Sequence, residues 1–338
     1  MSTPASPVAR LFDAFTAYQR TAALKAAIEL DLFTAVGAGA DTVRALAQRC
    51  DAAERGVRAL ANRLVVDGFL TKDANRYGLA PEAALFLDRT SPAYAGSAID
   101  FVNSPTIRQS FDTLTEAVRR GGTAVDSGGT VAPDHPVWVS FARAMAPMAA
   151  MTAELLASLL AAQGGIEGSV LDVAAGHGLF GITVARHHPA AHVVALDWPA
   201  VLEVAAENAA AAGVADRFTR LPGSAFDVDL GTGHAAVLIP NFLHHFDPAT
   251  CEAFLARVRR ALAPGGRAVV VEFVPDESRA GPPEAVAFSL TMLATTPAGD
   301  AYTFQEYRRM FAAAGFPDPT LHPLDPTPQH AVVATVRP

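Results

Sequence analysis

The stretch VLDVAAGHGLFG, from Val170 to Gly181, joins an apolar strand, a glycine turn and the start of a helix. Gly176, Gly178 and Gly181 stand in GxGxxG spacing, which lets a backbone turn tightly and approach a nucleotide at a helix N-terminus. Asp197 ends the next apolar run, where a carboxylate can accept both hydroxyls of a ribose. The pattern therefore predicts a nucleotide-binding strand–helix–strand unit.

The region after this turn repeats the same alternation. Short β-branched runs alternate with helical stretches from Gly168 onward, and VVATV near the C-terminus is expected to be the last strand. Apolar strands separated by helices favour a parallel sheet covered on both faces. The predicted fold class is therefore α/β, a Rossmann-like doubly wound sheet.

The N-terminal part has a different pattern. Apolar residues recur at helical spacing from Val8 to Ala35, and a series of helix, helix, short strand and turn follows from Asp41. This order predicts a mostly helical winged-helix domain at residues 1–105, whose first helices pair two chains. Residues 106–338 are then the catalytic domain with a helical linker. The glycine-rich stretch Gly121–Gly129 is expected to be a loop between the halves.

Composition narrows the possible partners. The chain has 338 residues, a net charge of −8 and a pI of about 5.7, which argues against nucleic acid or an anionic membrane. Its two cysteines, Cys50 and Cys251, lie too far apart in sequence to suggest a metal site. No export signal or membrane span is evident. We expect a cytoplasmic protein with a small-molecule substrate and no metal.

Asp172 favours one nucleotide over the others. It lies four residues before Gly176, at the carboxyl end of the strand. A carboxylate there would repel the pyrophosphate of NAD, whereas a sulfonium with an ammonium group would be attracted. The residues therefore favour S-adenosylmethionine.

From Ser169 to the end, the chain resembles class I S-adenosylmethionine-dependent methyltransferases, specifically the plant-type small-molecule O-methyltransferases and their bacterial relatives. The matching stretches are LDVAAGHG, ALDWP, GSAF, NFLHHFDPATC, LAPGGRAVVVEF and MLATTPAGDAYTFQEYRRMFAAAGF. The winged helix extends the resemblance. It implies a homodimer that methylates a hydroxyl of a small aromatic or polyketide-like metabolite of secondary metabolism.

The resemblance also implies a set of cofactor contacts. These are Asp172, Ala174, Gly176 and Gly178 for the methionine part, Asp197 for the ribose, and Trp198, Ser224, Ala225 and Phe226 for the adenine. The family usually has glycines at Ala174 and Ala175 and an aspartate at Ser224. Pro240 stands where plant enzymes commonly have lysine, so Asn241 is expected to serve instead.

His244 directly follows a predicted strand, and by family position it is the candidate base. An imidazole near its usual pKa of about 6.5 can take a hydroxyl proton at neutral pH. Glu272 ends the next strand and resembles the carboxylate that orients this base. The family's second acid falls at Ala301, next to Asp300. His245 is expected to face solvent or cap a helix.

A helix from Trp138 to Leu160 is expected beside this site. By resemblance, Met145 would contact the cofactor, whereas Trp138, Phe141, Met148 and Met292 would contact the acceptor. Methionine adapts well to aromatic rings. The same residues would equally suit a plain hydrophobic core.

Several alternatives stay open from sequence. The transfer could be to nitrogen or carbon, driven by proximity without a base. An NAD(P)-dependent oxidoreductase uses the same glycine spacing, although Asp172 argues against it. A ligand-sensing winged-helix regulator is opposed by residues 1–100, which hold eleven Lys plus Arg and eleven Asp plus Glu.

Overall fold

A computed structural model describes residues 6–125 and 137–337. These fall into two compact units, which divide between Asn103 and Ser104. The expected loop Gly121–Gly129 is described only as far as Val125, and its remainder lies outside the described residues.

The first unit is helical, with one antiparallel hairpin. Its elements are α1 (Pro7–Glu29), α2 (Leu32–Gly37), α3 (Val43–Arg49), α4 (Glu54–Val66), β1 (Leu70–Asp73), β2 (Arg76–Leu79), α5 (Pro81–Phe86) and α6 (Ala98–Val102). Strands β1 and β2 pair from Leu70↔Leu79 to Asp73↔Arg76. Helices followed by this hairpin give the element order expected of a winged helix.

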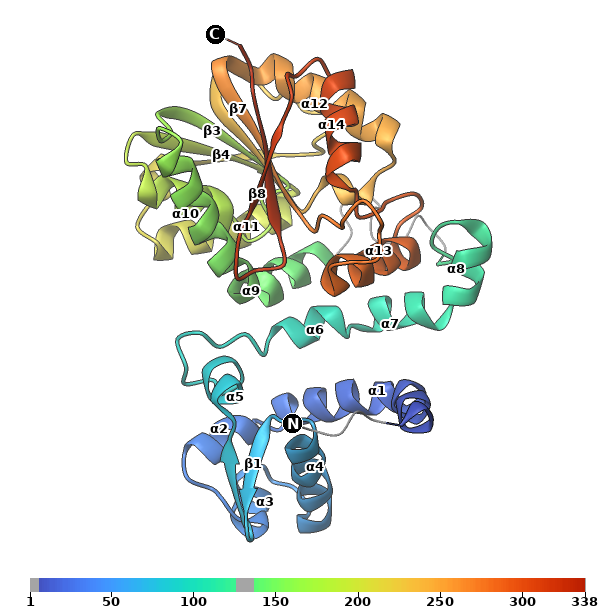
Figure 1. Cartoon of the computed structure of the whole chain (residues 1–338). Helices are drawn as coiled ribbons and strands as arrows, with labels where there is room; N and C mark the ends of the chain where they lie inside the picture. Colours follow the sequence, from blue (N-terminus) through green and yellow to red (C-terminus); the bar gives the residue numbers. More distant parts are fainter. Residues whose placement is uncertain (1–5, 126–136, 338) are drawn as a thin grey trace. The chain divides into compact units, whose positions relative to one another are not determined.

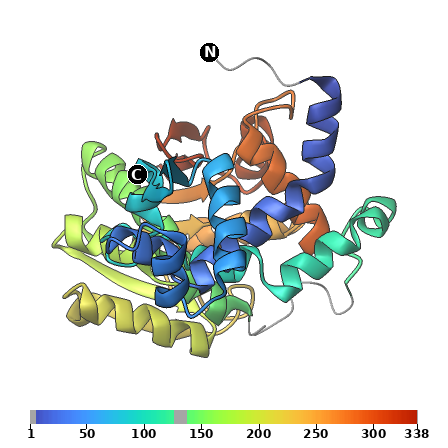
Figure 2. The ribbon, with the colours of Figure 1, turned by 90° about the horizontal axis from the view of Figure 1, so that it is seen from below.

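The first half of α1 projects from the rest of its unit (Figures 1 and 2). Its exposed side chains include five large apolar ones: Val8, Leu11, Phe12, Phe15 and Tyr18. A helix face of this kind, left open in a single chain, is typical of a surface that another protein covers.

The second unit is built on a seven-stranded sheet. Its elements are α7 (Pro105–Asp112), α8 (Leu114–Arg120), α9 (Val137–Ala162), β3 (Gly168–Val173), α10 (Leu179–His187), β4 (Ala191–Asp197), α11 (Pro199–Ala211), η2 (Ala215–Arg217), β5 (Phe218–Pro222), β6 (His234–Pro240), η3 (Leu243–His245), α12 (Pro248–Ala261), β7 (Leu262–Glu272), α13 (Pro283–Thr295), α14 (Phe304–Ala313), β8 (Thr320–Pro323) and β9 (His330–Thr335). The strand order is β5-β4-β3-β6-β7-β9-β8.

Strands β3 to β7 run parallel, and β9 joins antiparallel to both β7 and β8. Strand β8 did not appear in the sequence pattern, whereas β9 matches the expected VVATV strand. The predicted α/β doubly wound sheet is confirmed, with one antiparallel edge.

Period-two alternation sends each strand's apolar side chains to two cores. Leu171 and Val270 pack with α12 and α14, whereas Val170 and Val269 pack with α9 and α10. Figure 1 shows the sheet between these two sets of helices. The carboxyl ends of β3, β4, β6 and β7 are left to loops, which places the site residues there.

Among the described helices, only α9 is long and apolar enough to cross a membrane by length and composition, which is weak evidence by itself. Its Ala153, Leu156, Ala157 and Leu160 are fully buried. These residues belong to the core against α10.

Candidate active site

The glycine turn after β3 is fastened to the end of β4. Asp197 Oδ2 accepts a hydrogen bond from the Gly176 N–H at 2.8 Å, and Oδ1 accepts one from the Trp198 N–H at 2.7 Å. Burial raises the pKa of Asp197 to about 6. Each oxygen still has acceptor capacity, since a carboxylate offers about four lone-pair sites.

Asp172 lies beneath the turn. Its carboxylate is fully buried, and Oδ2 accepts the Gly181 N–H at 2.9 Å. Oδ1 is buried without a hydrogen-bond partner among the described residues. Burial raises the pKa of this carboxyl. The contact ties the end of β3 to the first turn of α10.

The three glycines differ in what they allow. A methyl group at Gly181 would come within 2.7 Å of Val193 Cγ1, and one at Gly178 within 3.0 Å of Ala205 Cβ. A methyl group at Gly176 would meet the Phe141 ring at 3.6 Å and the Ala174 carbonyl oxygen at 3.8 Å, which are ordinary contacts. Gly181 therefore serves the packing of α10 on the strands, and Gly178 the close approach of the turn to α11. Gly176 has space beside it, and its φ of +58° is what favours glycine there.

Ala174 has φ of +50°, in the left-handed region where a Cβ atom costs roughly 1 to 2 kcal/mol. This is one of the two positions at which the related family usually has glycine. The turn therefore keeps the glycine-like backbone with an alanine in it.

The GSAF turn follows β5. Ser224 Oγ accepts the Phe226 N–H at 3.2 Å. Arg257 on α12 donates to the carbonyls of Ala225 at 2.8 Å and Val228 at 2.7 Å, and also to that of Phe226. Nothing in the local sequence marks Arg257 as a support for this turn.

Asn241 lies at the end of β6 with φ of +53°. Its Oδ1 accepts a hydrogen bond from Gln329 Nε2 at 2.5 Å. This partner, just before β9, was also missed, because nothing local in the sequence links the two positions.

His244 and Glu272 meet at the ends of β6 and β7. Nδ1 of His244 lies 2.6 Å from Glu272 Oε2, and both side chains are almost fully buried, at 5% and 1% exposed. Glu272 Oε1 accepts the Phe242 N–H at 3.1 Å and the His244 N–H at 3.4 Å. Burial lowers the pKa of His244 to about 3 and raises that of Glu272 to about 8.

His245 is not a solvent-facing or capping residue, contrary to expectation. Its Nε2 lies 3.2 Å from His244 Nε2, and its Nδ1 is buried. The following helix, α12, is capped instead by Asp247, whose Oδ1 accepts the Thr250 N–H. The His245 side chain therefore points inward, toward His244.

Aromatic rings frame the two histidines. Phe288 on α13 lies edge-on to His244 at 4.7 Å, and Trp138 on α9 lies edge-on to His245 at 5.2 Å. Phe141 stacks on His177 of the glycine turn at 6.2 Å. Helix α9 therefore contacts both the glycine turn and the two histidines. Phe288 was not among the site residues predicted from the sequence.

The methionines lie at different depths. Met292 is buried, Met145 is half-buried, and Met148 is 54% exposed.

Ala301, at the position of the family's second acid, is buried. The neighbouring Asp300 binds other groups, with Arg279 at 2.9 Å and Ser289 Oγ at 2.5 Å. Asp300 therefore does not replace the missing acid beside His244.

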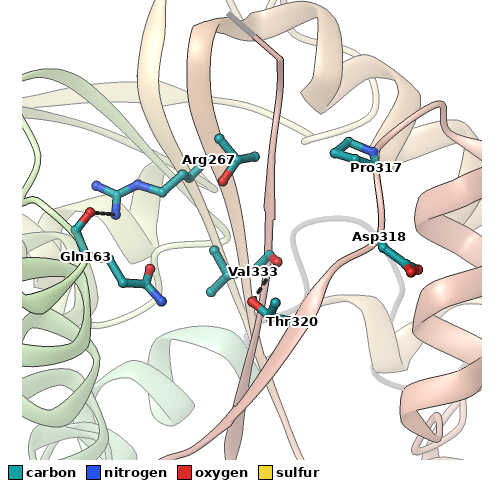
Figure 3. Close-up of a pocket in the computed structure, with 7 residues that line it drawn as sticks. Gln163, Arg267, Pro317, Asp318, Thr320 and Val333 are labelled. Atoms are coloured by element: carbon teal, nitrogen blue, oxygen red, sulfur yellow. Dashed lines mark hydrogen bonds between the residues drawn. The ribbon is translucent and has the colours of Figure 1, made fainter.

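A hollow of about 290 Å³ lies away from these residues (Figure 3). Gln163 in its wall precedes the start of β3, and Thr335 ends β9, which runs antiparallel to β7, whereas Glu272 ends β7. The hollow therefore belongs to the opposite end of the sheet.

Among residues 6–125 and 137–337, no three His, Cys, Asp or Glu side chains are grouped so as to hold a metal ion.

Comparison with known proteins agrees with this geometry. Residues 113–317 match the O-methyltransferase domain family, and residues 12–89 match the O-methyltransferase dimerisation domain family. A 3-hydroxy-5-methyl-1-naphthoate 3-O-methyltransferase of Streptomyces sahachiroi is 31% identical over 90% of this chain and 88% of its own. The tetracenomycin polyketide synthesis 8-O-methyl transferase of Streptomyces glaucescens is 28% identical over 89% of each chain.

Solved structures extend the comparison. A crystal structure from Nostoc punctiforme PCC 73102, provisionally assigned as an O-methyltransferase, has a TM-score of 0.94 and 52% identity over 98% of this chain and 100% of its own. Structures with the same fold at 21% and 22% identity contain S-adenosylmethionine or its demethylated product.

The sheet order and the glycine turn with its acid define a class I methyltransferase fold. Within that class, the chain belongs to the O-methyltransferase family with an N-terminal dimerisation domain. Its methyl donor is S-adenosylmethionine, and the predicted family and cofactor are confirmed.

Proposed function

We propose that this enzyme methylates a hydroxyl group on a small aromatic or polyketide-like molecule, and that the His244–Glu272 pair takes up the proton that the hydroxyl loses. The 2.6 Å contact between His244 Nδ1 and Glu272 Oε2 carries the proposal. Transfer to carbon or nitrogen by proximity alone would leave this buried pair without a chemical purpose.

The turn residues fit the methyl donor. Asp197 keeps acceptor capacity for ribose hydroxyls beyond its two backbone partners. Asp172 Oδ1 lacks a partner among the described residues. A bound cation would favour the ionised form of this carboxyl, whose field would then add to the attraction. The bound donor would supply an electrophilic methyl group on a sulfonium. Trp198, Ser224, Ala225, Phe226, Asn241 and Met145 are the proposed further contacts.

The pair's protonation suits a base. Burial keeps His244 neutral by lowering its pKa to about 3. Once Glu272 is ionised it accepts the His244 Nδ1–H, which leaves Nε2 as the proton acceptor. The imidazolium formed by proton uptake would then lie against a carboxylate, which stabilises it.

The side chains around the bound acceptor would be aromatic and apolar. Trp138, Phe141, Met148 and Met292 are the proposed contacts, with Phe288 added from its 4.7 Å approach to His244. Flat aromatic substrates pack well against such rings. The naphthoate and polyketide acceptors of the two Streptomyces relatives have this chemistry.

An acceptor screen tests the proposal. Purified enzyme, S-adenosylmethionine and 3-hydroxy-5-methyl-1-naphthoate are the starting mixture, followed by hydroxylated naphthoates and anthraquinones. Mass spectrometry should show a gain of one methyl group at a hydroxyl. The matched methyl ether, which has no free hydroxyl, is the control. Methylation of that control at carbon would contradict the proposal.

We further propose that two copies pair through α1. The dimerisation-domain match and the five exposed apolar side chains of α1 support a homodimer, because pairing removes apolar surface from water. Light scattering at micromolar concentration should give twice the chain mass. Phe12→Asp with Phe15→Asp should shift the mass toward one chain.

A further inference from the structure

The base nitrogen of His244 is already engaged. His244 Nε2 lies 3.2 Å from His245 Nε2, and the His244 side chain is only 5% exposed. A hydroxyl that approached His244 directly would have to displace the neighbouring imidazole. His245 therefore occupies the position at which a proton would enter the pair.

The hydrogen-bond directions follow from the carboxylate. Ionised Glu272 can only accept, so His244 Nδ1 carries the proton in the 2.6 Å contact. Neutral His244 then has a lone pair on Nε2, and His245 must donate its Nε2–H to it. A neutral His245 with a protonated Nε2 has an unprotonated Nδ1.

Among the described residues, Nδ1 of His245 has no hydrogen-bond partner. Nδ1 of His245 is buried and accepts no hydrogen bond from residues 6–125 or 137–337. A buried polar atom of this kind needs an explanation. A hydroxyl donor on a bound acceptor molecule would satisfy it.

We propose that His245 Nδ1 takes the acceptor's hydroxyl proton and that His245 passes its Nε2 proton to His244. This inference rests on the hydroxyl-methylating function proposed above. His245 is then the catalytic base, and His244 and Glu272 act through it as positioning and charge-receiving residues.

The step balances. The acceptor O–H bond breaks as the His245 Nδ1–H bond forms, while the His245 Nε2–H bond breaks as the His244 Nε2–H bond forms. The electron pair left on oxygen makes the new bond to the methyl group, and the C–S bonding pair returns to sulfur. One proton ends on His244, beside ionised Glu272.

The surroundings of the two histidines explain why the positive charge passes from His245 to His244. Burial and the neighbouring His244 both lower the pKa of His245. The other rings beside His245 are Trp138 on α9 and Phe246, the next residue in the chain, and neither carries a charge. Glu272 contacts only the first histidine, so a positive charge is held better on His244 than on His245.

Nitrogen NMR of the wild-type protein tests the chain of protons without any substrate. Histidine-labelled, unliganded protein at pH 9, above the Glu272 pKa of about 8, should show His245 with an unprotonated Nδ1 and a protonated Nε2. His244 should show the opposite tautomer. Spectra of His244→Gln and His245→Gln assign the signals. A protonated His245 Nδ1 at pH 9 would overturn the proposal.

Turnover on the hydroxylated acceptor separates a relay from a mere hydrogen bond. His245→Gln keeps an N–H donor for His244 but cannot pass a proton, so kcat should fall about 10²-fold, the usual loss for a general base, while KM stays within about twofold. His245→Phe should fall as far. The exposed His192→Gln is the matched control. A glutamine variant within about threefold of wild type would overturn the relay.

The two proposals fail differently. If wild-type enzyme methylates no hydroxyl while NMR gives the expected tautomers, the proposed function is wrong and the proton chain stands as structure. If hydroxyls are methylated and His245→Gln is unimpaired, only the relay is wrong.

Discussion

The two halves of the strand-end site use their acids for different purposes. At β3 and β4, Asp172 and Asp197 are held by backbone N–H groups of the turn they organise. At β6 and β7, Glu272 also accepts two backbone N–H groups, but its other oxygen holds a side chain, His244, which in turn meets His245. The first half is fixed by local chain geometry, whereas the second is assembled from side chains that can exchange protons. Substitutions should therefore impair binding in one half and chemistry in the other.

The largest expected effect is on chemistry. His244→Ala removes the imidazole between Glu272 and His245, so turnover should fall about 10² to 10⁴-fold, the range for a lost general base. Cofactor affinity should stay nearly intact, because the glycine turn is untouched. Steady-state kinetics measures turnover, and calorimetry with S-adenosylhomocysteine measures cofactor affinity.

If turnover of His244→Ala fell only a few-fold, proximity alone would drive the transfer, and the β6–β7 half of the site would not be the half that carries the chemistry. His234→Ala is an unsuitable control, since His234 is bonded to Ser169 and Leu230. The exposed His192→Ala is the better one and should retain wild-type turnover.

Binding should respond at the other half. Asp197→Ala removes the charged acceptor for the ribose and the bonds to Gly176 and Trp198, so cofactor binding should weaken by roughly 2 to 3 kcal/mol, about 30- to 150-fold. Asp197→Asn keeps one carbonyl acceptor and should lose less. Calorimetry gives both values, and unchanged affinity in the alanine variant would remove Asp197 from the cofactor site.

The two halves also differ in what the sequence predicts. Gly176 and Asp197 follow from spacing, because a glycine turn and the next strand end are close in sequence. His244 and Glu272 came only with the family resemblance. The contact between the histidine rings, the Arg257 clamp and the Gln329 bond were missed, because side-chain directions and contacts across the sheet leave no local pattern. Strand β8 was missed because its four residues are too few to show a clear alternation.

A pH profile sharpens the account of the catalytic half. The pKa of Glu272 is raised to about 8 and that of His244 lowered to about 3. The pair therefore becomes a proton acceptor only as pH rises through the Glu272 pKa, and turnover should rise about tenfold from pH 7 to pH 9. Glu272→Gln should abolish this rise. A profile that follows the ionisation of each acceptor instead would contradict the assignment.

The smallest effect concerns the backbone of the cofactor half. Ala174 has φ of +50°, whereas Ala175 does not lie in the left-handed region and its methyl group is 2% exposed. Ala174→Gly should relieve about 1 to 2 kcal/mol of strain while the freer unfolded chain costs about 0.4 to 1 kcal/mol, so Tm should rise by roughly 2 °C. Ala175→Gly makes the same chemical change but loses a buried methyl group and frees the unfolded chain, so it should lower stability by about 1 kcal/mol. Scanning calorimetry of both variants decides the matter. Equal shifts of one sign would mean that backbone conformation does not govern this turn, although both variants restore the residue usual in the family.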